Sequence, residues 1–210
     1  PYGGVVPELA SREHLRALAI LVERALATGS AAPELVAVTA GPGLIGALLV
    51  GLRFAAAFAW ARSLPLAPVD HLEGHLVSPL LDLGGAPARP EPARSLALVA
   101  SGGHSSWYLM AAGERRRLGR TRDDAAGESF DKVAQVLGLE YPGGPVLDRL
   151  ARGGDAEAVP LPRPRIREAP FDFSFSGLKS AAIRWIREHR LAGAGEGSPA
   201  VADIAAAFEA

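Results

Sequence analysis

No cysteine occurs among the 210 residues of the sequence. This absence excludes disulfide scaffolds, iron–sulfur clusters, thiolate-bound zinc and cysteine nucleophiles, so any metal must be held by His, Asp or Glu. Asparagine is absent as well, and lysine is scarce, because Lys132 and Lys179 are the only lysines among 22 basic residues. The presence of Lys179 in such an arginine-rich chain suggests a role that arginine cannot fill.

An excess of charge of either sign is also lacking. The formal net charge is −1, so no overall basic field points to nucleic acid, and any RNA contact would need a local arginine patch. Hydrophobic residues make up 49% and charged residues 21%, a balance that excludes disorder of the whole chain. One large domain or two small lobes fit this length.

Long hydrophobic runs are missing too. The longest uncharged run, residues 35–52, is interrupted by Gly41-Pro42-Gly43, which favours a strand, a turn and a helix over a membrane span. No secretory signal opens the chain, and we expect a cytoplasmic protein without a membrane segment. The sequence lacks an initiator methionine and ends at Ala210 without a helix-stop signal, so we expect a piece of a longer protein.

Hydrophobic periodicity predicts a β-α-β unit in the first half of the chain. Apolar residues recur at helical spacing over 11–27, and a short continuous apolar run at 35–39 is typical of a buried strand. A mostly buried helix over 44–62 and a strand over 67–69 follow. This order argues for a largely parallel sheet covered by helices.

The second half contains shorter elements. Strands over 95–100 and 105–111 form a hairpin around Gly102-Gly103, and residues 83–94, rich in Gly and Pro, are the best linker candidate. We expect a strand over 171–175 and an extended Pro/Arg loop over 160–167. The predicted helices cover residues 131–137, 146–151 and 177–190.

The segment His71-Leu72-Glu73-Gly74-His75 is the first group that could carry chemistry. On a helix, residues four apart lie about 40° from each other, so both imidazoles could reach one metal ion. Glu73 would lie about 200° from His71, which misplaces it as the base of a His-Glu-x-x-His metalloprotease. Two ligands are too few for a complete site, and two unrelated histidines at a strand–helix junction remain the alternative.

Two glycine pairs could let a ligand approach the backbone closely. Ser101-Gly102-Gly103-His104 follows a strand, and exposed N–H groups in such a turn suit an anion. An ordinary hairpin turn is the alternative. Gly143-Gly144, followed by Asp148, offers a second close approach, with a plain loop between helices as its alternative.

Acidic and basic clusters leave further alternatives open. Four acids within residues 123–131 could bind a cation or a ribose, or could simply favour a helix that begins at Asp131. Phe173 and Phe175 alternate with polar residues, which predicts an edge strand with both rings on the core face. Arginines cluster at 115–122, 163–167 and 184–190, either as solvated faces or as phosphate contacts for RNA.

These segments together resemble the tRNA N6-adenosine threonylcarbamoyltransferase family, in its bacterial form. The matching stretches occur in the family order and span nearly the whole chain. They are residues 3–12, 38–51, 69–76, 101–104, 123–132, 141–145 and 173–179.

The resemblance implies an α/β fold of the actin/Hsp70/sugar-kinase-like type with two lobes, here incomplete. Residues 1–93 would be the N-terminal lobe without its first strands, and residues 94–210 the C-terminal lobe without its last segments. His71 and His75 would be two ligands of one Fe²⁺ or Zn²⁺ ion per subunit, with the third ligand outside this chain. The substrate-binding residues would be Val99, Ala100, Ser101, Gly102 and Gly103 for the adenylate, and Asp131, Gly144 and Asp148 for its nucleoside.

The implied reaction moves a threonylcarbamoyl group from threonylcarbamoyl-AMP to N6 of adenosine 37 in tRNAs that read ANN codons, with release of AMP. The implied partners are tRNA, a paralogous dimerisation subunit and an ATPase subunit. Without the missing ends, this chain is expected to bind metal poorly and to be inactive. An inactive actin-like scaffold subunit and a metalloprotease are the alternatives, and the paired histidines together with the Ser101–His104 turn favour the transferase.

Overall fold

The computed structural model describes residues 6–29, 31–81, 90, 92–111 and 113–210. The chain divides into two compact units, residues 1–90 and residues 91–210. Most of the predicted linker at 83–94 and residues 3–5 of the first matching stretch lie outside the described residues. The assignment of residues 1–93 and 94–210 to the two lobes of an actin-like fold stays a prediction.

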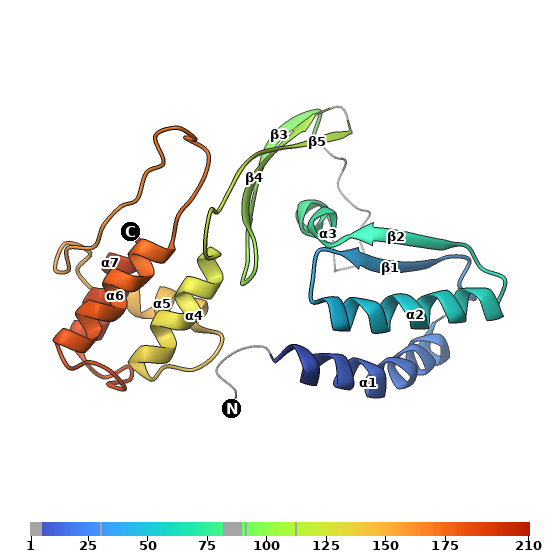
Figure 1. Cartoon of the computed structure of the whole chain (residues 1–210), viewed down its shortest axis with the longest axis horizontal. Helices are drawn as coiled ribbons and strands as arrows, with labels where there is room; N and C mark the ends of the chain where they lie inside the picture. The colour runs from blue at the N-terminus through green and yellow to red at the C-terminus, as the bar shows by residue number, and fades with distance from the viewer. Residues whose placement is uncertain (1–5, 30, 82–89, 91, 112) are drawn as a thin grey trace. The chain divides into compact units, whose positions relative to one another are not determined.

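The first unit contains the predicted β-α-β arrangement (Figure 1), but the predicted burial of its first strand and of its helix is wrong, because residues 36–41 include no buried residue and the helix buries only Ala55 and Ala59. Strand β1 (Val36–Gly41) pairs in parallel with β2 (Leu66–Asp70), and the helix α2 (Ile45–Ala61) connects them. Helix α1 (Pro7–Thr28) packs against α2, and it begins four residues before the predicted start because Pro7 suits the first turn of a helix. Helix α3 (His71–Val77) follows β2 directly and continues into a short 3₁₀ helix (Ser78–Leu80).

The sheet of the second unit has three antiparallel strands in the order β3-β4-β5. The predicted hairpin is confirmed as β3 (Arg94–Ala100) and β4 (Ser105–Ala111). Strand β5 (Glu114–Arg120) was not predicted, because its run of arginines hides the alternation of apolar and polar residues that identifies a strand. Gly113, with a φ of +79°, provides the turn that leads into it.

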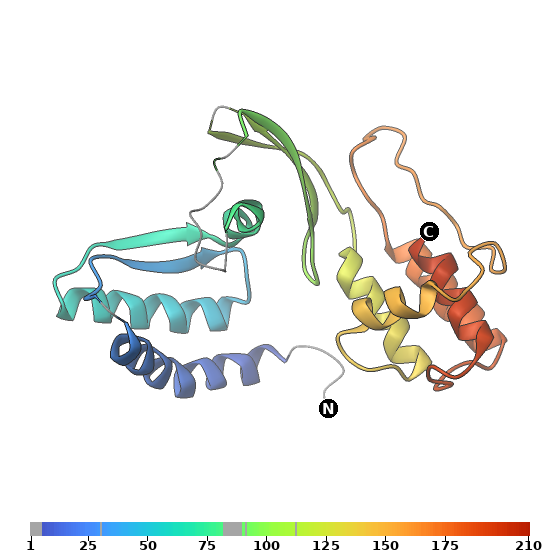
Figure 2. The same cartoon turned by 180° about the vertical axis from the view of Figure 1, so that it is seen from behind.

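Four helices form the core of the second unit (Figure 1, Figure 2). They are α4 (Ala126–Leu137), α5 (Gly143–Ala151), α6 (Ser176–Glu188) and α7 (Pro199–Glu209). Helix α5 packs against α4 and α7, and α6 packs against α4 and α7. Their shared interior is fully enclosed and consists mainly of aliphatic side chains, among them Val133, Leu137, Leu147, Ile186 and Ile204.

Several predicted boundaries in this unit are wrong. Helix α4 begins at Ala126 rather than Asp131, and α5 begins at Gly143 rather than Val146. The predicted strand at 171–175 is reduced to a single bridge between Phe173 and Thr121, because the chain turns into α6 at Ser176. Helix α7 was not predicted. In the part of the chain that the structure describes, no helix is both long and apolar enough to cross a membrane.

Candidate functional site

The paired histidines lie at the start of α3, in the first unit. Asp70, the last residue of β2, fixes this start because its Oδ1 accepts hydrogen bonds from the backbone N–H groups of Leu72 (2.7 Å) and Glu73 (3.3 Å). An aspartate at this position is a favoured helix N-cap. Strand β2 therefore leads directly into a capped helix, α3, whose first and fifth residues are the two histidines.

The two imidazole rings pack edge to face, with an angle of 68° between their planes. Their Nε2 atoms lie 3.2 Å apart, the ring centroids are separated by 4.5 Å, and both side chains are half-buried. Two nitrogen ligands of one tetrahedral ion, each about 2.0–2.1 Å from it, would lie about 3.3–3.4 Å apart. The spacing of the two Nε2 atoms therefore fits a shared metal ion, whereas Glu73 is exposed.

A complete metal site is not formed within the described residues. No group of three or more His, Cys, Asp or Glu side chains that could hold a metal ion occurs among them. The geometry supplies two nitrogen donors and leaves the remaining ligands to other groups. Metal binding by His71 and His75 therefore stays a prediction, one with which the distance between the rings agrees.

In the second unit, the turn between β3 and β4 is held by Ser101. Its Oγ accepts hydrogen bonds from the backbone N–H groups of His104 (3.1 Å) and Gly103 (3.4 Å), and its own N–H donates to the carbonyl of His104 (2.8 Å). Gly102 and Gly103 are exposed, with open space where a Cβ would lie. The backbone at these two glycines is therefore fixed and accessible to a ligand.

The first turn of α4 packs directly on this glycine turn. The backbone N–H of Gly127 donates to the carbonyl of Ser101 (3.2 Å), and that of Ala126 donates to Ser105 Oγ (2.9 Å). A Cβ at position 127 would lie 2.8 Å from backbone atoms of Ser101 and Gly102. Only glycine permits this approach, so the end of β3 and the start of α4 form one rigid corner.

Asp131 joins this corner to α5. It lies four residues beyond Gly127 and therefore on the same face of α4, and its Oδ1 accepts a hydrogen bond from the backbone N–H of Gly143 (2.8 Å). Asp131 thus helps to cap α5 and does not start its own helix, which corrects the alternative considered for this acid. Its Oδ2 is left for another donor.

Gly144 and Asp148 follow Gly143 along α5. The backbone N–H groups in the first turn of a helix have no hydrogen-bond partner within that helix. In α5, the Gly143 N–H donates to Asp131 and Pro145 has no N–H, so the Gly144 N–H is the remaining amide of the first turn. Asp148 lies one turn further, where it forms an ion pair with Arg152 (2.8 Å). Burial, followed by repulsion from Asp148, raises the pKa of Glu209 above its ordinary value.

Contacts therefore link several of the sequence-predicted binding residues of the second unit. They run from the end of β3, at Val99 and Ala100, through the Ser101–Gly103 turn to the face of α4 that carries Asp131, and on to Gly143 at the start of α5, the helix that also contains Gly144 and Asp148. A small ligand would meet backbone N–H groups at its anionic end and carboxylates at its hydroxylated end. The roles assigned to these residues stay predictions.

Two further acids have structural partners that the sequence did not reveal. Asp123 accepts hydrogen bonds from the hydroxyls of Ser174 and Ser176, both at 2.7 Å, and from the backbone N–H groups of Phe175 (2.8 Å) and Ser176 (3.2 Å). It therefore caps α6 from about 50 residues away in the sequence. Asp124 Oδ2 lies 2.5 Å from Lys179 Nζ in a largely buried ion pair. Because both carboxylates are engaged in these contacts, neither Asp123 nor Asp124 is available to bind the cation or ribose considered above.

Adjacent glycines in α5 give a test of the packing at this site. A Cβ at Gly143 would lie 2.4 Å from Ala134 Cβ, whereas a Cβ at Gly144 would meet nothing within 4 Å. We expect Gly143→Ala to lower the free energy of unfolding by about 1 kcal/mol, because overpacking exceeds the gain in helix propensity. Gly144→Ala should be neutral or slightly stabilising. Urea unfolding of both variants measures the difference, and equal values would contradict the close packing of α5 on α4.

Comparison with known proteins gives a uniform result. A model of the family described as tRNA N6-adenosine threonylcarbamoyltransferase matches residues 1–210. Proteins of that name from Sorangium cellulosum and Bordetella petrii are each 52% identical to the chain, which is covered completely, and the match takes in 61% and 60% of their own lengths. One from Desulforapulum autotrophicum is 54% identical over 90% of the chain and 56% of its own length. The chain thus spans about three fifths of the length of these relatives.

Proposed function

The chain belongs to the tRNA N6-adenosine threonylcarbamoyltransferase family, and on this premise we propose that it forms part of an enzyme that modifies adenosine 37 of tRNAs reading ANN codons. The observation that carries the proposal is the family match along the entire chain, at about half identity to several relatives. We propose further that units 1–90 and 91–210 belong to the two lobes of an actin-like fold.

The proposed reaction is an acyl transfer. The N6 amine of adenosine attacks the carbamoyl carbon of threonylcarbamoyl-AMP, a new C–N bond forms, and the bond between that carbon and the phosphate oxygen breaks. AMP leaves with the bonding electron pair, and the amine loses one proton. The chemistry needs an activated carbonyl and a positioned amine, and it needs no nucleophilic side chain such as cysteine, which this sequence does not contain.

The residues of the second unit are suited to hold the adenylate. The fixed and exposed backbone at Gly102 can donate its N–H group to a phosphate oxygen, since backbone amides in such turns bind anions, whereas the Gly103 N–H is already donated to Ser101 Oγ (3.4 Å). Asp131, with its Oδ2 free of the contact to Gly143, can accept a hydrogen bond from a ribose hydroxyl. The Gly144 amide and Asp148 lie further along α5 and can orient the rest of the nucleoside.

We propose that His71 and His75 hold an Fe²⁺ or Zn²⁺ ion, as the 3.2 Å between their Nε2 atoms allows. Bound there, the metal would supply Lewis acidity and a fixed point for a substrate oxygen. The histidines themselves are oriented by α3, whose start is fixed by Asp70. We further propose a cytoplasmic location, and partnership with a paralogous dimerisation subunit and an ATPase subunit.

The two other functions considered from the sequence are weaker. A non-catalytic scaffold has no use for two imidazoles whose Nε2 atoms are adjacent or for an accessible glycine turn anchored on a helix. A metalloprotease needs a general base beside its histidines, and Glu73 is exposed. The names of the relatives also favour the transferase.

Nucleoside mass spectrometry tests the proposal directly. Unmodified tRNA is incubated with threonylcarbamoyl-AMP, metal and the partner subunits, once with this chain and once with the chain extended to the length of its relatives. We expect threonylcarbamoyladenosine at least with the extended chain. No product from either form, with metal bound and partners present, would favour the scaffold.

A further inference from the structure

Strand β5 and the residues after it form a local concentration of positive charge. Residues 115–122 include five arginines, although the net charge of the whole chain is −1. Arg116, Arg117, Arg120 and Arg122 are exposed. A local arginine patch is the feature that a nearly neutral protein needs in order to contact a polyanion.

The patch carries more positive charge than its acid can neutralise. Asp172 is the acid at this place, and one of its oxygens accepts the backbone N–H of Arg120 (2.9 Å) while the other pairs with Arg122 Nε. Hydrogen bonds from the Arg120 backbone and the Arg122 side chain hold the pKa of Asp172 below its ordinary value, so it stays ionised. Among the described residues, no acid forms an ion pair with the guanidinium of Arg117 or Arg120.

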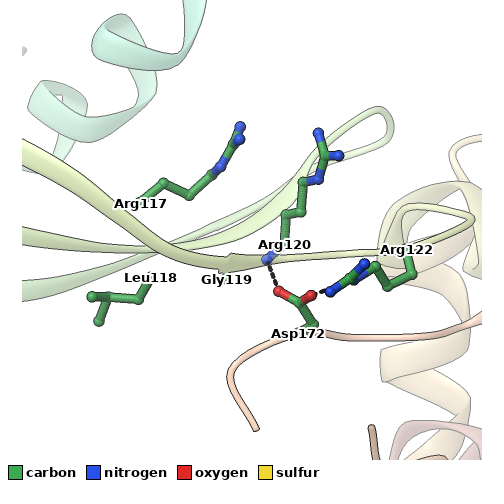
Figure 3. Close-up of a pocket in the computed structure, with 6 residues that line it drawn as sticks. All are labelled: Arg117, Leu118, Gly119, Arg120, Arg122 and Asp172. Carbon is green, nitrogen blue, oxygen red and sulfur yellow. Dashed lines mark hydrogen bonds and ion pairs between the residues drawn. The ribbon is translucent and has the colours of Figure 1, made fainter. Parts of the chain in front are cut away.

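The two unpaired arginines are presented together. Arg117 pairs with Tyr108 and Arg120 with Ser106 across the β4–β5 ladder, and a bulge at Leu118 brings both arginines to the same face of the sheet. Figure 3 shows their side chains projecting from one side of the strand, while Asp172 lies on the other side. They line an open pocket of about 220 Å³ together with Leu118, Gly119, Arg122 and Asp172.

The segment that contains Asp172 holds this arrangement in place. The backbone N–H of Phe173 donates to the carbonyl of Arg120 (3.0 Å), and that of Arg122 donates to the carbonyl of Phe173 (2.9 Å). The segment therefore adds a single parallel bridge at Thr121, directly after β5, so the end of the strand at Arg120 is held on both sides. The strand fixes the backbone positions of both arginines, and the planar guanidinium group loses less freedom per hydrogen bond to a phosphate than a lysine ammonium group would.

We propose that Arg117 and Arg120 bind backbone phosphates of the tRNA that the enzyme modifies. This inference rests on the proposed function, because it takes tRNA as the substrate. Guanidinium groups donate paired hydrogen bonds to phosphate, and an exposed row along a strand suits successive phosphates of a polymer better than one enclosed small anion. The patch shares no residue with the set assigned to the adenylate, although Ser106 pairs with Arg120 on one side and with Val99 on the other.

The double variant Arg117→Ala/Arg120→Ala tests the inference. In the enzyme with its partners, we expect the Kd for unmodified tRNA, measured by filter binding near 0.1 M salt, to rise about tenfold or more. The slope of log K against log salt should fall in magnitude by about 1.4–1.8, as expected for two lost phosphate contacts. Circular dichroism establishes that the variant is folded, and Arg117→Lys/Arg120→Lys should recover part of the affinity.

The matched control is Arg12→Ala/Arg16→Ala in α1. It removes the same charge, but each of these exposed arginines is paired with a helical glutamate, Glu8 or Glu13. We expect no change in the Kd for tRNA. An unchanged Kd and salt slope in the β5 variant, or an equal loss in the control, would overturn the inference.

A second measurement separates a small-anion site from an RNA site. AMP and inorganic phosphate are titrated calorimetrically into the parent and the β5 variant. Loss of their binding with unchanged tRNA affinity would overturn the inference in favour of a small-anion pocket. Failure of the proposed function would be distinct: the parent enzyme would form no modified nucleoside. Failure of the inference alone would leave product formation intact and the KM for tRNA unchanged in the variant.

Discussion

In the chain extended to the length of its relatives, simultaneous replacement of His71 and His75 by alanine should abolish both the proposed metal binding and the proposed threonylcarbamoyl transfer. The two Nε2 atoms lie 3.2 Å apart, and the two rings pack edge to face. Removal of both takes away every ligand that this chain is proposed to supply. Because loss of groups that merely orient a metal ligand already costs 10–100-fold, we expect transfer to fall by at least about a hundredfold. Metal content by mass spectrometry and nucleoside analysis measure the two effects on one preparation.

The control for this experiment is His14→Ala. His14 is exposed on α1, where its Nδ1 contacts the carbonyl of Ala10 (2.7 Å), and it has no assigned role. This variant should keep both metal and transfer. Full transfer by a metal-free preparation of the His71/His75 double variant would show that the two imidazoles serve another purpose.

The β-α-β unit could be predicted because its signals are local. A few consecutive residues are enough to indicate each part of this unit: the apolar run of β1, the glycine–proline turn at 41–43 and the long apolar helix α2. The observed α2 differs from the prediction by one residue at each end. The hairpin of β3 and β4 is announced in the same way by Gly102-Gly103. Periodicity and turn residues are sufficient where neighbours in the sequence are neighbours in space.

The predictions that failed concern segments whose structure is decided by residues distant in the sequence. Phe173 and Phe175 alternate with polar residues as in a strand, but the chain must turn into α6 at Ser176, and the segment pairs only once, with Thr121. Strand β5 is stabilised by pairing with β4, so its arginines need no apolar alternation of their own. In both cases the partner, and not the segment, decides the local structure.

For the candidate site, too, local features could be predicted from the sequence, whereas contacts between distant segments could not. The sequence indicated which residue types could carry chemistry, and the structure adds the contacts between them, such as Asp131 with Gly143 and Gly127 with the Ser101 turn. These contacts join segments that are separated in the sequence. No pattern within residues 123–132 indicates that Asp123 caps a helix that begins at Ser176, because that contact exists only once the helices have packed.

The contacts of Asp123 make it a strong determinant of stability in the second unit. Partial desolvation, the largest single contribution, raises the pKa of this carboxyl even though the residue is exposed, but four hydrogen bonds together outweigh it, and the pKa lies well below its ordinary value. The donors are the hydroxyls of Ser174 and Ser176 and the backbone N–H groups of Phe175 and Ser176. The N-cap residue of α6, Phe175, has no side chain that can take over this role.

Asp123→Ala should therefore destabilise the unit by about 2–3 kcal/mol at neutral pH. Loss of an N-cap costs about 0.5–2 kcal/mol, and two serine hydroxyls also lose a charged acceptor, an effect that solvent partly offsets at this exposed site. Asp123→Asn keeps one acceptor oxygen and should cost about half as much. Urea unfolding gives the free energies, and hydrogen exchange should locate the lost protection in the first turn of α6. Glu140→Ala removes another exposed acid of the same unit and should be neutral.

The pH dependence distinguishes a charged cap from simple packing. Because the pKa of Asp123 is lower in the folded chain than in the unfolded chain, the unfolded state binds the proton more readily, and the stabilisation is complete above the ordinary carboxyl pKa of about 4. It is lost as the pH falls from about 4 towards the lowered pKa. The difference in unfolding free energy between the parent and Asp123→Asn should therefore be constant from pH 5 to pH 7 and shrink below pH 4. A difference that persists unchanged at pH 3 would show that the carboxylate charge does not hold the start of α6.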